Sequence, residues 1–149
     1  PPRLVIVDSR LETPPGARLW GAAQREVLIY TSDADTSRAA PLRERGAQVV
    51  ALPNPHGKVD LAAMLRDLAA REVNEVHVEA GHKLNGSLLR EGLVDELLLY
   101  QAPRLLGEGA GIAALGPFTA VEQALALEWT EIVRVGPDLR LRARLGHQR

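Results

Sequence analysis

Short apolar runs alternate with helix-forming stretches through the first two thirds of this chain. The runs have the length of strands that are buried on both faces, and they stand at residues 4–7, 27–30, 48–52, 76–80 and 97–100. Strands separated by helices pair in parallel through right-handed crossovers. The pattern therefore predicts an α/β fold with a mostly parallel sheet flanked by helices.

Two of the intervening stretches carry clear helix signals. A cap at Thr36 or Ser37 would begin a helix that runs to about Arg45 and stops at Gly46. Asp60 should cap a second, amphipathic helix. The apolar residues of that helix share one face: Leu61, Met64, Leu65 and Leu68.

The last third of the chain has a different pattern. Residues 129–135 and 139–145 alternate around Gly136-Pro137-Asp138, which predicts an antiparallel hairpin. Residues 121–126 are expected to form a helical turn. The second strand of the hairpin is expected at a sheet edge, where its basic residues would face solvent and discourage edge-to-edge pairing. These basic residues are Arg140, Arg142 and Arg144.

Composition excludes several classes of protein. The formal net charge of −1 and the 3% of aromatic residues argue against a nucleic-acid partner. The absence of cysteine excludes disulfides and Cys zinc sites, and it fits a reducing cytoplasm. No apolar run approaches the roughly 18 residues that span a bilayer. We therefore expect a soluble, cytoplasmic protein with no membrane partner. The opening Pro1-Pro2, without Met, suggests a piece of a longer polypeptide.

The strongest functional signal lies between residues 76 and 87. A buried strand should lead through a turn between Gly81 and Gly86 into a helix from Asn85 to about Glu91. This order would aim the free backbone N–H groups of the helix at a point beyond the end of the strand. Their partial positive charge attracts anions, most often phosphate.

Two interpretations of this turn stay open. The pattern of Gly81, Gly86 and Ser87 is close to a Walker A loop, but it lacks the Lys that reaches the terminal phosphates. The glycines could instead merely allow a tight turn and close helix packing. We favour phosphate binding, because α/β sheets bind ligands in crevices at strand ends. A second glycine-rich stretch, at residues 107–111, could be an active-site loop or a plain turn.

Polar residues at the expected strand ends are the candidates for ligand contact. Glu79 would end a buried strand, where a carboxylate needs hydrogen bonds, either from substrate N–H and hydroxyl groups or from the backbone of the next turn. Ser9, which follows Asp8 after the first strand, could contact a ligand or stabilise a turn. His77, Glu79 and His82 lack the spacing of a known metal motif, so no metal site is expected.

Seven blocks in order along nearly the whole chain resemble the reductase half of the bifunctional riboflavin-biosynthesis deaminase/reductase family. The region from 79 to 97 is highly specific for this family. The blocks are VIVDS (5–9), TPP (13–15), VEAG (78–81), GSLL (86–89), GLVDEL (92–97), APRLLG (102–107) and VGPDL (135–139).

The resemblance implies a dihydrofolate-reductase-like fold, NADPH as the hydride donor, and reduction of 5-amino-6-(5-phosphoribosylamino)uracil to its ribitylamino product. Glu79 would contact this phosphoribosylamino-pyrimidine substrate. By matching position, NADPH would be contacted by Ser9, Gly81, His82, Lys83, Leu84, Asn85, Gly86 and Ser87. His82, Lys83 and Asn85 depart from the residues expected there, so backbone contacts should persist better than side-chain contacts.

The resemblance also implies missing parts. The zinc deaminase domain is absent, and so are the first strand and helix of the reductase domain. That first strand should lie between residues 76–80 and 97–100. The whole chain would then be one incomplete reductase domain that is nearly inactive alone. The resemblance also implies a homodimer. The alternative is a non-catalytic nucleotide-binding or assembly module with the same fold.

Overall fold

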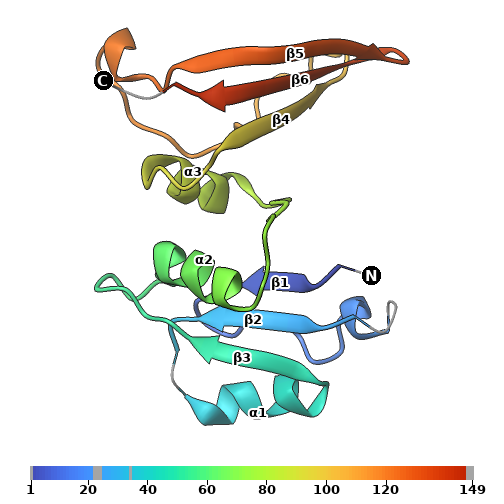
Figure 1. Ribbon diagram of the computed structural model, residues 1–149, viewed down its shortest axis with the longest axis vertical. Helices are drawn as coiled ribbons and strands as arrows, with labels where there is room; N and C mark the ends of the chain where they lie inside the picture. Colours follow the sequence, from blue (N-terminus) through green and yellow to red (C-terminus); the bar gives the residue numbers. More distant parts are fainter. Residues whose placement is uncertain (1, 22–24, 34, 147–149) are drawn as a thin grey trace. The chain divides into compact units, whose positions relative to one another are not determined.

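The computed structural model describes residues 2–21, 25–33 and 35–146 (Figure 1). The chain divides into two compact units, Pro1–Glu75 and Val76–Arg149. Each unit has its own three-stranded sheet.

The first unit is built on a parallel sheet. Its strands are β1 (Leu4–Val7), β2 (Val27–Thr31) and β3 (Ala47–Ala51), in the order β1-β2-β3. All pairs are parallel. The three strands and their parallel pairing were predicted from the sequence, and both predictions are confirmed.

Two helices cover opposite faces of this sheet (Figure 1). They are α1 (Thr36–Glu44) and α2 (Leu61–Ala70). Side chains of a strand alternate between the two faces, and β2 is buried along its whole length because both faces are covered. The face toward α1 holds a core cluster of Leu11, Val27, Ile29, Ala39, Leu42 and Ala47.

The start of α1 differs from the prediction. Asp35 caps this helix, and its carboxylate accepts a hydrogen bond from the N–H of Ser37 at 2.8 Å. The predicted cap at Thr36 or Ser37 is therefore wrong, because the acidic residue just before them satisfies the first free N–H group. The cap of α2 is confirmed: Asp60 accepts a hydrogen bond from the N–H of Ala63 at 2.8 Å.

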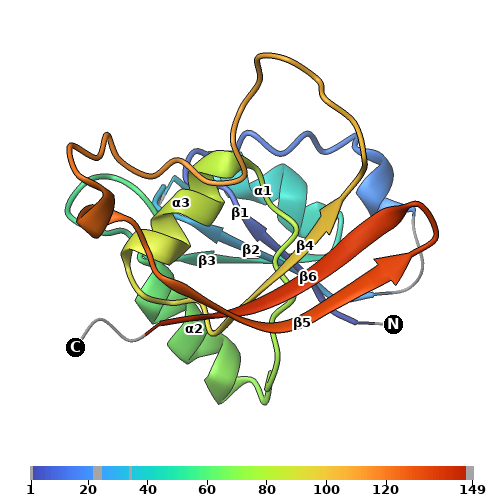
Figure 2. The same ribbon diagram turned by 90° about the horizontal axis from the view of Figure 1, so that it is seen from above.

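The second unit contains one α-helix and an antiparallel sheet. The helix is α3 (His82–Arg90), and the strands are β4 (Glu96–Gln101), β5 (Leu127–Val135) and β6 (Asp138–Leu145). The predicted hairpin of β5 and β6 and the predicted helical turn, a 3₁₀ turn at Val121–Gln123, are confirmed (Figure 2). No helix in the described part of the chain is long and apolar enough to cross a membrane.

The position of β6 corrects a second prediction. The strand order is β4-β6-β5, so β6 is the central strand and not an edge. Its arginines pair across the sheet instead of pointing freely into solvent: Arg140 lies 2.9 Å from Glu131, and Arg142 lies 3.1 Å from Glu96. The sequence pattern showed the hairpin but not that β4 would join its other side.

Residues 76–80 correct a third prediction, because they form no strand. No backbone hydrogen bond of this segment to another backbone group is present among the described residues. Val78 is 44% exposed. An apolar sequence becomes a strand only where a neighbour supplies a hydrogen-bonded ladder. In the structure β1 and β4 are end strands of their sheets, and neither pairs with this segment.

A partly buried polar network ties β2 to α2. The hydroxyl of Tyr30, which is 0% exposed, donates to Asp67 at 2.6 Å, and Arg71 donates to the same carboxylate oxygen at 2.7 Å. Burial and then the hydrogen bond to Asp67 raise the pKa of Tyr30. The hydrogen bond from Tyr30 is the main cause that lowers the pKa of Asp67; burial opposes it, and Arg71 adds to it.

We predict that Tyr30→Phe lowers the free energy of unfolding by about 1–2 kcal/mol, because Asp67 loses a buried donor. Urea denaturation measures this. Tyr100→Phe is the matched control, since Tyr100 is 61% exposed; it should change stability by less than about 0.5 kcal/mol. The pKa of Asp67 is lowered in the folded state, so its ionised carboxylate stabilises the fold. This contribution to the free energy of unfolding is present above about pH 4 and is lost as the pH falls further. Equal effects of the two substitutions would contradict this account.

Candidate functional site

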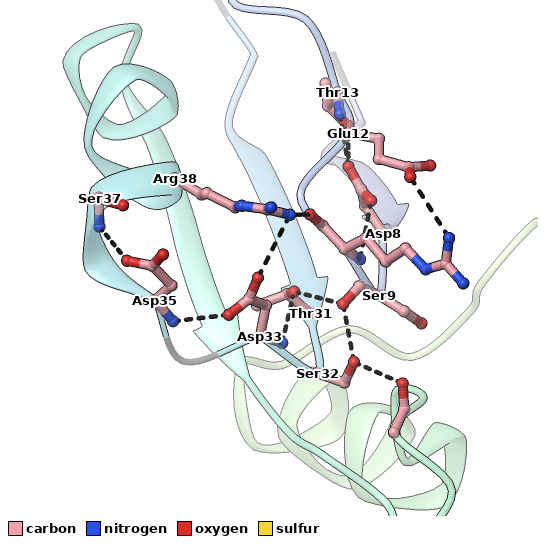
Figure 3. Close-up of polar contacts among 12 residues, drawn as sticks. Asp8, Ser9, Glu12, Thr13, Thr31, Ser32, Asp33, Asp35, Ser37 and Arg38 are labelled. Carbon is pink, nitrogen blue, oxygen red and sulfur yellow. Dashed lines mark hydrogen bonds and ion pairs between the residues drawn. The ribbon is translucent and has the colours of Figure 1, made fainter.

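Polar side chains gather where β1 and β2 of the first unit end (Figure 3). The carboxyl ends of parallel strands lie at the same edge of a sheet, which brings the residues after β1 beside those after β2. This carboxyl edge carries Asp8, Ser9, Thr31, Ser32 and Asp33. Edges of this kind are the usual ligand sites of open α/β sheets.

Asp8 organises the loop that follows β1. Its carboxylate accepts hydrogen bonds from the backbone N–H and the hydroxyl of Thr13, at 2.7 and 2.6 Å, and from the N–H of Arg10 at 3.3 Å. Partial burial is the largest single effect and favours the neutral acid. The hydrogen bonds, with that of the Thr13 hydroxyl first, together outweigh it and lower the pKa of Asp8. The ionised carboxylate thus holds the backbone around Ser9 in place.

Ser9 has structural partners of its own. Its hydroxyl oxygen accepts a hydrogen bond from the N–H of Val59 at 3.3 Å. Its carbonyl oxygen accepts from the hydroxyls of Ser32, at 2.8 Å, and Thr31, at 3.3 Å. These contacts give Ser9 the turn-stabilising role that the sequence left open. Among the described residues no acceptor takes the hydroxyl hydrogen of Ser9, so this hydrogen is available to a ligand.

A cation lies beside the carboxyl edge. Arg38 of α1 donates to the carbonyl oxygen of Arg10 at 3.1 Å, and its guanidinium is 3.8 Å from the carboxylate of Asp33. The same carboxylate accepts a hydrogen bond from the N–H of Asp35 at 2.8 Å. Arg38 therefore joins the β1 loop to the start of α1 (Figure 3). No sequence pattern pointed to Arg38 as part of the site, because its helix position alone does not show what it contacts.

The start of α3 is the second part of the candidate site. The helix begins at His82 and not at Asn85, so the predicted glycine turn is in fact the first helical turn. Gly81 is the N-cap and supplies no side-chain hydrogen bond. The N–H of Asn85 is the first to bond within the helix, to the carbonyl oxygen of Gly81 at 3.2 Å. The N–H groups of His82, Lys83 and Leu84 have no partner among the described residues.

The two glycines of this segment have different surroundings. A Cβ atom at Gly81 would meet nothing within 4 Å. A Cβ atom at Gly86 would collide with the backbone of Ala114, whose N and C atoms would lie 2.8 Å away. The close-packing interpretation therefore holds for Gly86, while the space around Gly81 is open to a ligand.

The side chain of Asn85 is already engaged. Its amide group donates to the carbonyl oxygens of Ala80, at 3.2 Å, and Ile112, at 2.9 Å. Arg90, at the end of the helix, donates to the carbonyl oxygen of Ala114. These residues fasten α3 to residues 112–114, and they leave the Asn85 amide few donors for a cofactor.

Glu79 is not buried, contrary to the prediction. Its side chain is 85% exposed and lies 3.4 Å from Nε2 of His77. The reason is the missing strand pairing of residues 76–80, which leaves the segment open to solvent. Lys83 is exposed as well, and Ser87 donates to its carbonyl oxygen at 3.2 Å. In the described part of the chain, no three acidic or histidine side chains gather as a metal site.

The predicted site residues thus fall into two groups. Glu79 and the residues from Gly81 to Ser87 are continuous in the second unit, whereas Ser9 belongs to the first. The sequence did not reveal the contact of Gly86 with Ala114, because these residues lie 28 positions apart and no local pattern links them.

The fold places this protein in the α/β class, as predicted, with a parallel sheet in one unit and an antiparallel sheet in the other. Comparison with sequence families identifies the family within this fold class. The chain belongs to the RibD C-terminal domain family, whose model matches residues 1–141.

Known proteins similar to this chain agree with the family. The chain is 33% identical over 139 residues to the riboflavin biosynthesis protein RibD of Escherichia coli, covering 93% of this chain and 36% of that protein. It is 35% identical over 85 residues to the 5-amino-6-(5-phosphoribosylamino)uracil reductase of Buchnera aphidicola, covering 56% of this chain and 41% of that protein. A solved structure of Acinetobacter baumannii RibD superposes with a TM-score of 0.80 at 27% identity, covering 97% of this chain and 38% of the other. The chain therefore spans well under half the length of these relatives.

We predict that Gly86→Ala lowers the free energy of unfolding by about 1–3 kcal/mol, because the added methyl group overpacks the contact with Ala114. Gly81→Ala is the matched control and should cost less than about 1 kcal/mol, the scale of a changed N-cap. Thermal or urea unfolding measures both. A larger loss of unfolding free energy for Gly81→Ala than for Gly86→Ala would contradict the packing role of Gly86.

Proposed function

We propose that this chain is the C-terminal reductase part of a longer bifunctional enzyme that reduces 5-amino-6-(5-phosphoribosylamino)uracil to its ribitylamino product with NADPH. The family match and the names of the relatives support this activity. The structural observation that carries it is the open start of α3, where three backbone N–H groups have no partner within residues 2–21, 25–33 and 35–146. An exposed carboxylate, Glu79, stands just before them.

The start of α3 fits the pyrophosphate of a nicotinamide cofactor. The N–H groups of His82, Lys83 and Leu84 would donate to phosphate oxygens, and the helix dipole adds positive potential there. Gly81 leaves room for the approach, and the exposed Lys83 adds a full positive charge. Backbone donation does not depend on side-chain identity, so the unusual residues at 82, 83 and 85 are compatible with it. When bound, NADPH supplies the hydride.

Ser9 and Glu79 would take the remaining roles. The hydroxyl hydrogen of Ser9 would be donated to the cofactor, while its oxygen keeps the hydrogen bond to Val59. The carboxylate of Glu79 accepts hydrogen bonds only, so it suits the N–H and hydroxyl groups of a ribosylamino-pyrimidine. The contribution of the protein to the reaction is to hold the two reactants within bonding range.

Unpaired backbone supports the proposal that this domain is incomplete. Residues 76–80 have a strand-like sequence but pair with no strand in the described part of the chain, and β1 and β4 each have one sheet neighbour. We propose that a further segment of the parent polypeptide supplies the absent strand and helix, and that a deaminase domain precedes it. The chain alone should then have little or no activity. The proposal includes a cytoplasmic homodimer, as the resemblance implies.

We predict that Glu79→Ala, in the full-length protein, raises the dissociation constant of the substrate at least tenfold, because a charged hydrogen bond contributes about 1.5–3 kcal/mol. The dissociation constant of NADPH should change less than about twofold. Isothermal titration calorimetry with each ligand separately measures both. Glu75→Ala is the matched control, since Glu75 is exposed like Glu79 and lies four residues before it in the sequence; it should leave both constants unchanged.

Two results would decide against this assignment. Equal loss of affinity for substrate and cofactor would remove Glu79 from the substrate-binding role. Tight NADPH binding by the full-length protein without reduction of the pyrimidine would favour the alternative, a non-catalytic nucleotide-binding module.

A further inference from the structure

A cavity of about 300 Å³ lies at the end of the first unit opposite to the carboxyl edge. Three elements line it: the 3₁₀ turn at Arg18–Trp20, the start of β2 and the end of α1. The residues that matter for its chemistry are Leu19, Trp20, Arg25, Val27 and Arg45. No part of the proposed cofactor site takes part in this cavity.

The cavity is strongly basic. Arg25 and Arg45 both line it, no acidic residue does, and neither arginine has an ion-pair partner in the described part of the chain. The neighbouring acid, Glu26, already pairs with Arg3 and accepts a hydrogen bond from Gln48 at 2.8 Å. Residues 22–24 are Ala, Ala and Gln, so they add no negative charge.

The guanidinium of Arg25 is also short of a hydrogen-bond acceptor. Its Nε atom is buried and finds no partner among the described residues. A buried donor without an acceptor costs about 1–3 kcal/mol, and more when it is charged. The buried Nε atom is itself closed to solvent, so an anion in the cavity would bind the terminal N–H groups of the guanidinium, whose fork suits phosphate or carboxylate oxygens.

Trp20 lines the cavity and also packs against the core cluster of the first unit. Its indole N–H donates to the carbonyl oxygen of Pro14 at 3.0 Å, which fixes the ring. Leu19 and Val27 supply further apolar lining. Indole rings stack on planar bases, and such stacking contributes about 1–3 kcal/mol per base. The cavity thus combines two cations with one stacking surface.

We propose that this cavity binds a small planar organic phosphate, of the size of a purine nucleoside monophosphate. The phosphate would lie between Arg25 and Arg45, with the ring against Trp20. A volume of about 300 Å³ is at the lower end for small-molecule sites and suits a mononucleotide better than a dinucleotide. The five residues of β2 separate this site from the carboxyl edge by roughly 15 Å, so the two ligands would not compete.

Tryptophan fluorescence tests the proposal directly. The chain has two tryptophans, so Trp129→Phe leaves Trp20 as the single reporter. Adenosine 5′-monophosphate is titrated into this variant, with inorganic phosphate and adenosine as separate arms. We expect a saturable change in Trp20 emission with the monophosphate, and at least tenfold weaker binding of either half alone. NADPH added beforehand should not shift the curve.

Two substitutions test the cations. Arg25→Gln and Arg45→Gln should each weaken monophosphate binding at least fivefold, whereas Arg66→Gln, an exposed arginine of α2 outside the cavity, should change it less than twofold. Circular dichroism checks that each variant is folded. If Arg25→Gln does not fold, the monophosphate affinities of Arg45→Gln and Arg25→Lys test the proposal instead. Absence of a saturable signal at millimolar monophosphate, equal effects of the cavity and control substitutions, or displacement by NADPH would each overturn the proposal.

Discussion

The second unit depends on one backbone contact, the approach of Gly86 in α3 to Ala114. No side chain larger than hydrogen fits there, so the helix and residues 112–114 lie directly against each other. Asn85 and Arg90 fasten the same contact with hydrogen bonds to backbone carbonyl oxygens. The middle and end of α3 therefore hold its start in place, while the first three N–H groups have no partner among the described residues. A glycine that serves packing thus positions the end of the helix that we propose binds phosphate.

In the first unit, strand pairing and a carboxylate hold the candidate ligand-binding residues in place. Parallel pairing of β1 and β2 brings their carboxyl ends to one edge, and the ionised Asp8 holds the loop that follows β1 through Thr13 and Arg10. Ser9 then has a fixed backbone, and its hydroxyl hydrogen has no acceptor in the part of the chain that the structure describes. The same sheet leaves Arg25 and Arg45 at its opposite end. One small α/β unit can therefore present two chemically different surfaces, a carboxyl edge rich in acids and hydroxyls and a basic cavity beside Trp20.

Much of this fold could be predicted from local pattern. The runs at β1, β2 and β3, the cap at Asp60 and the hairpin turn at residues 136–137 are local features, and each was confirmed. The errors occurred where the outcome depends on distant partners. Residues 76–80 have a strand-like sequence, but no neighbour provides a ladder, and this leaves Glu79 exposed. The central place of β6 and the packing role of Gly86 depend on β4 and Ala114, which no local pattern identifies. The site residues predicted by resemblance lie partly at an open helix start and partly in the other unit.

The central claim is that the start of α3 binds the phosphates of the cofactor through its backbone. Amide hydrogen exchange of the full-length protein, measured with and without saturating NADPH, tests it most directly. The N–H groups of His82, Lys83 and Leu84 have no partner in the described structure, so they should exchange quickly without cofactor. The account predicts that NADPH slows their exchange markedly, more than that of the rest of α3. Unchanged exchange at these three positions, with NADPH binding verified independently, would contradict it.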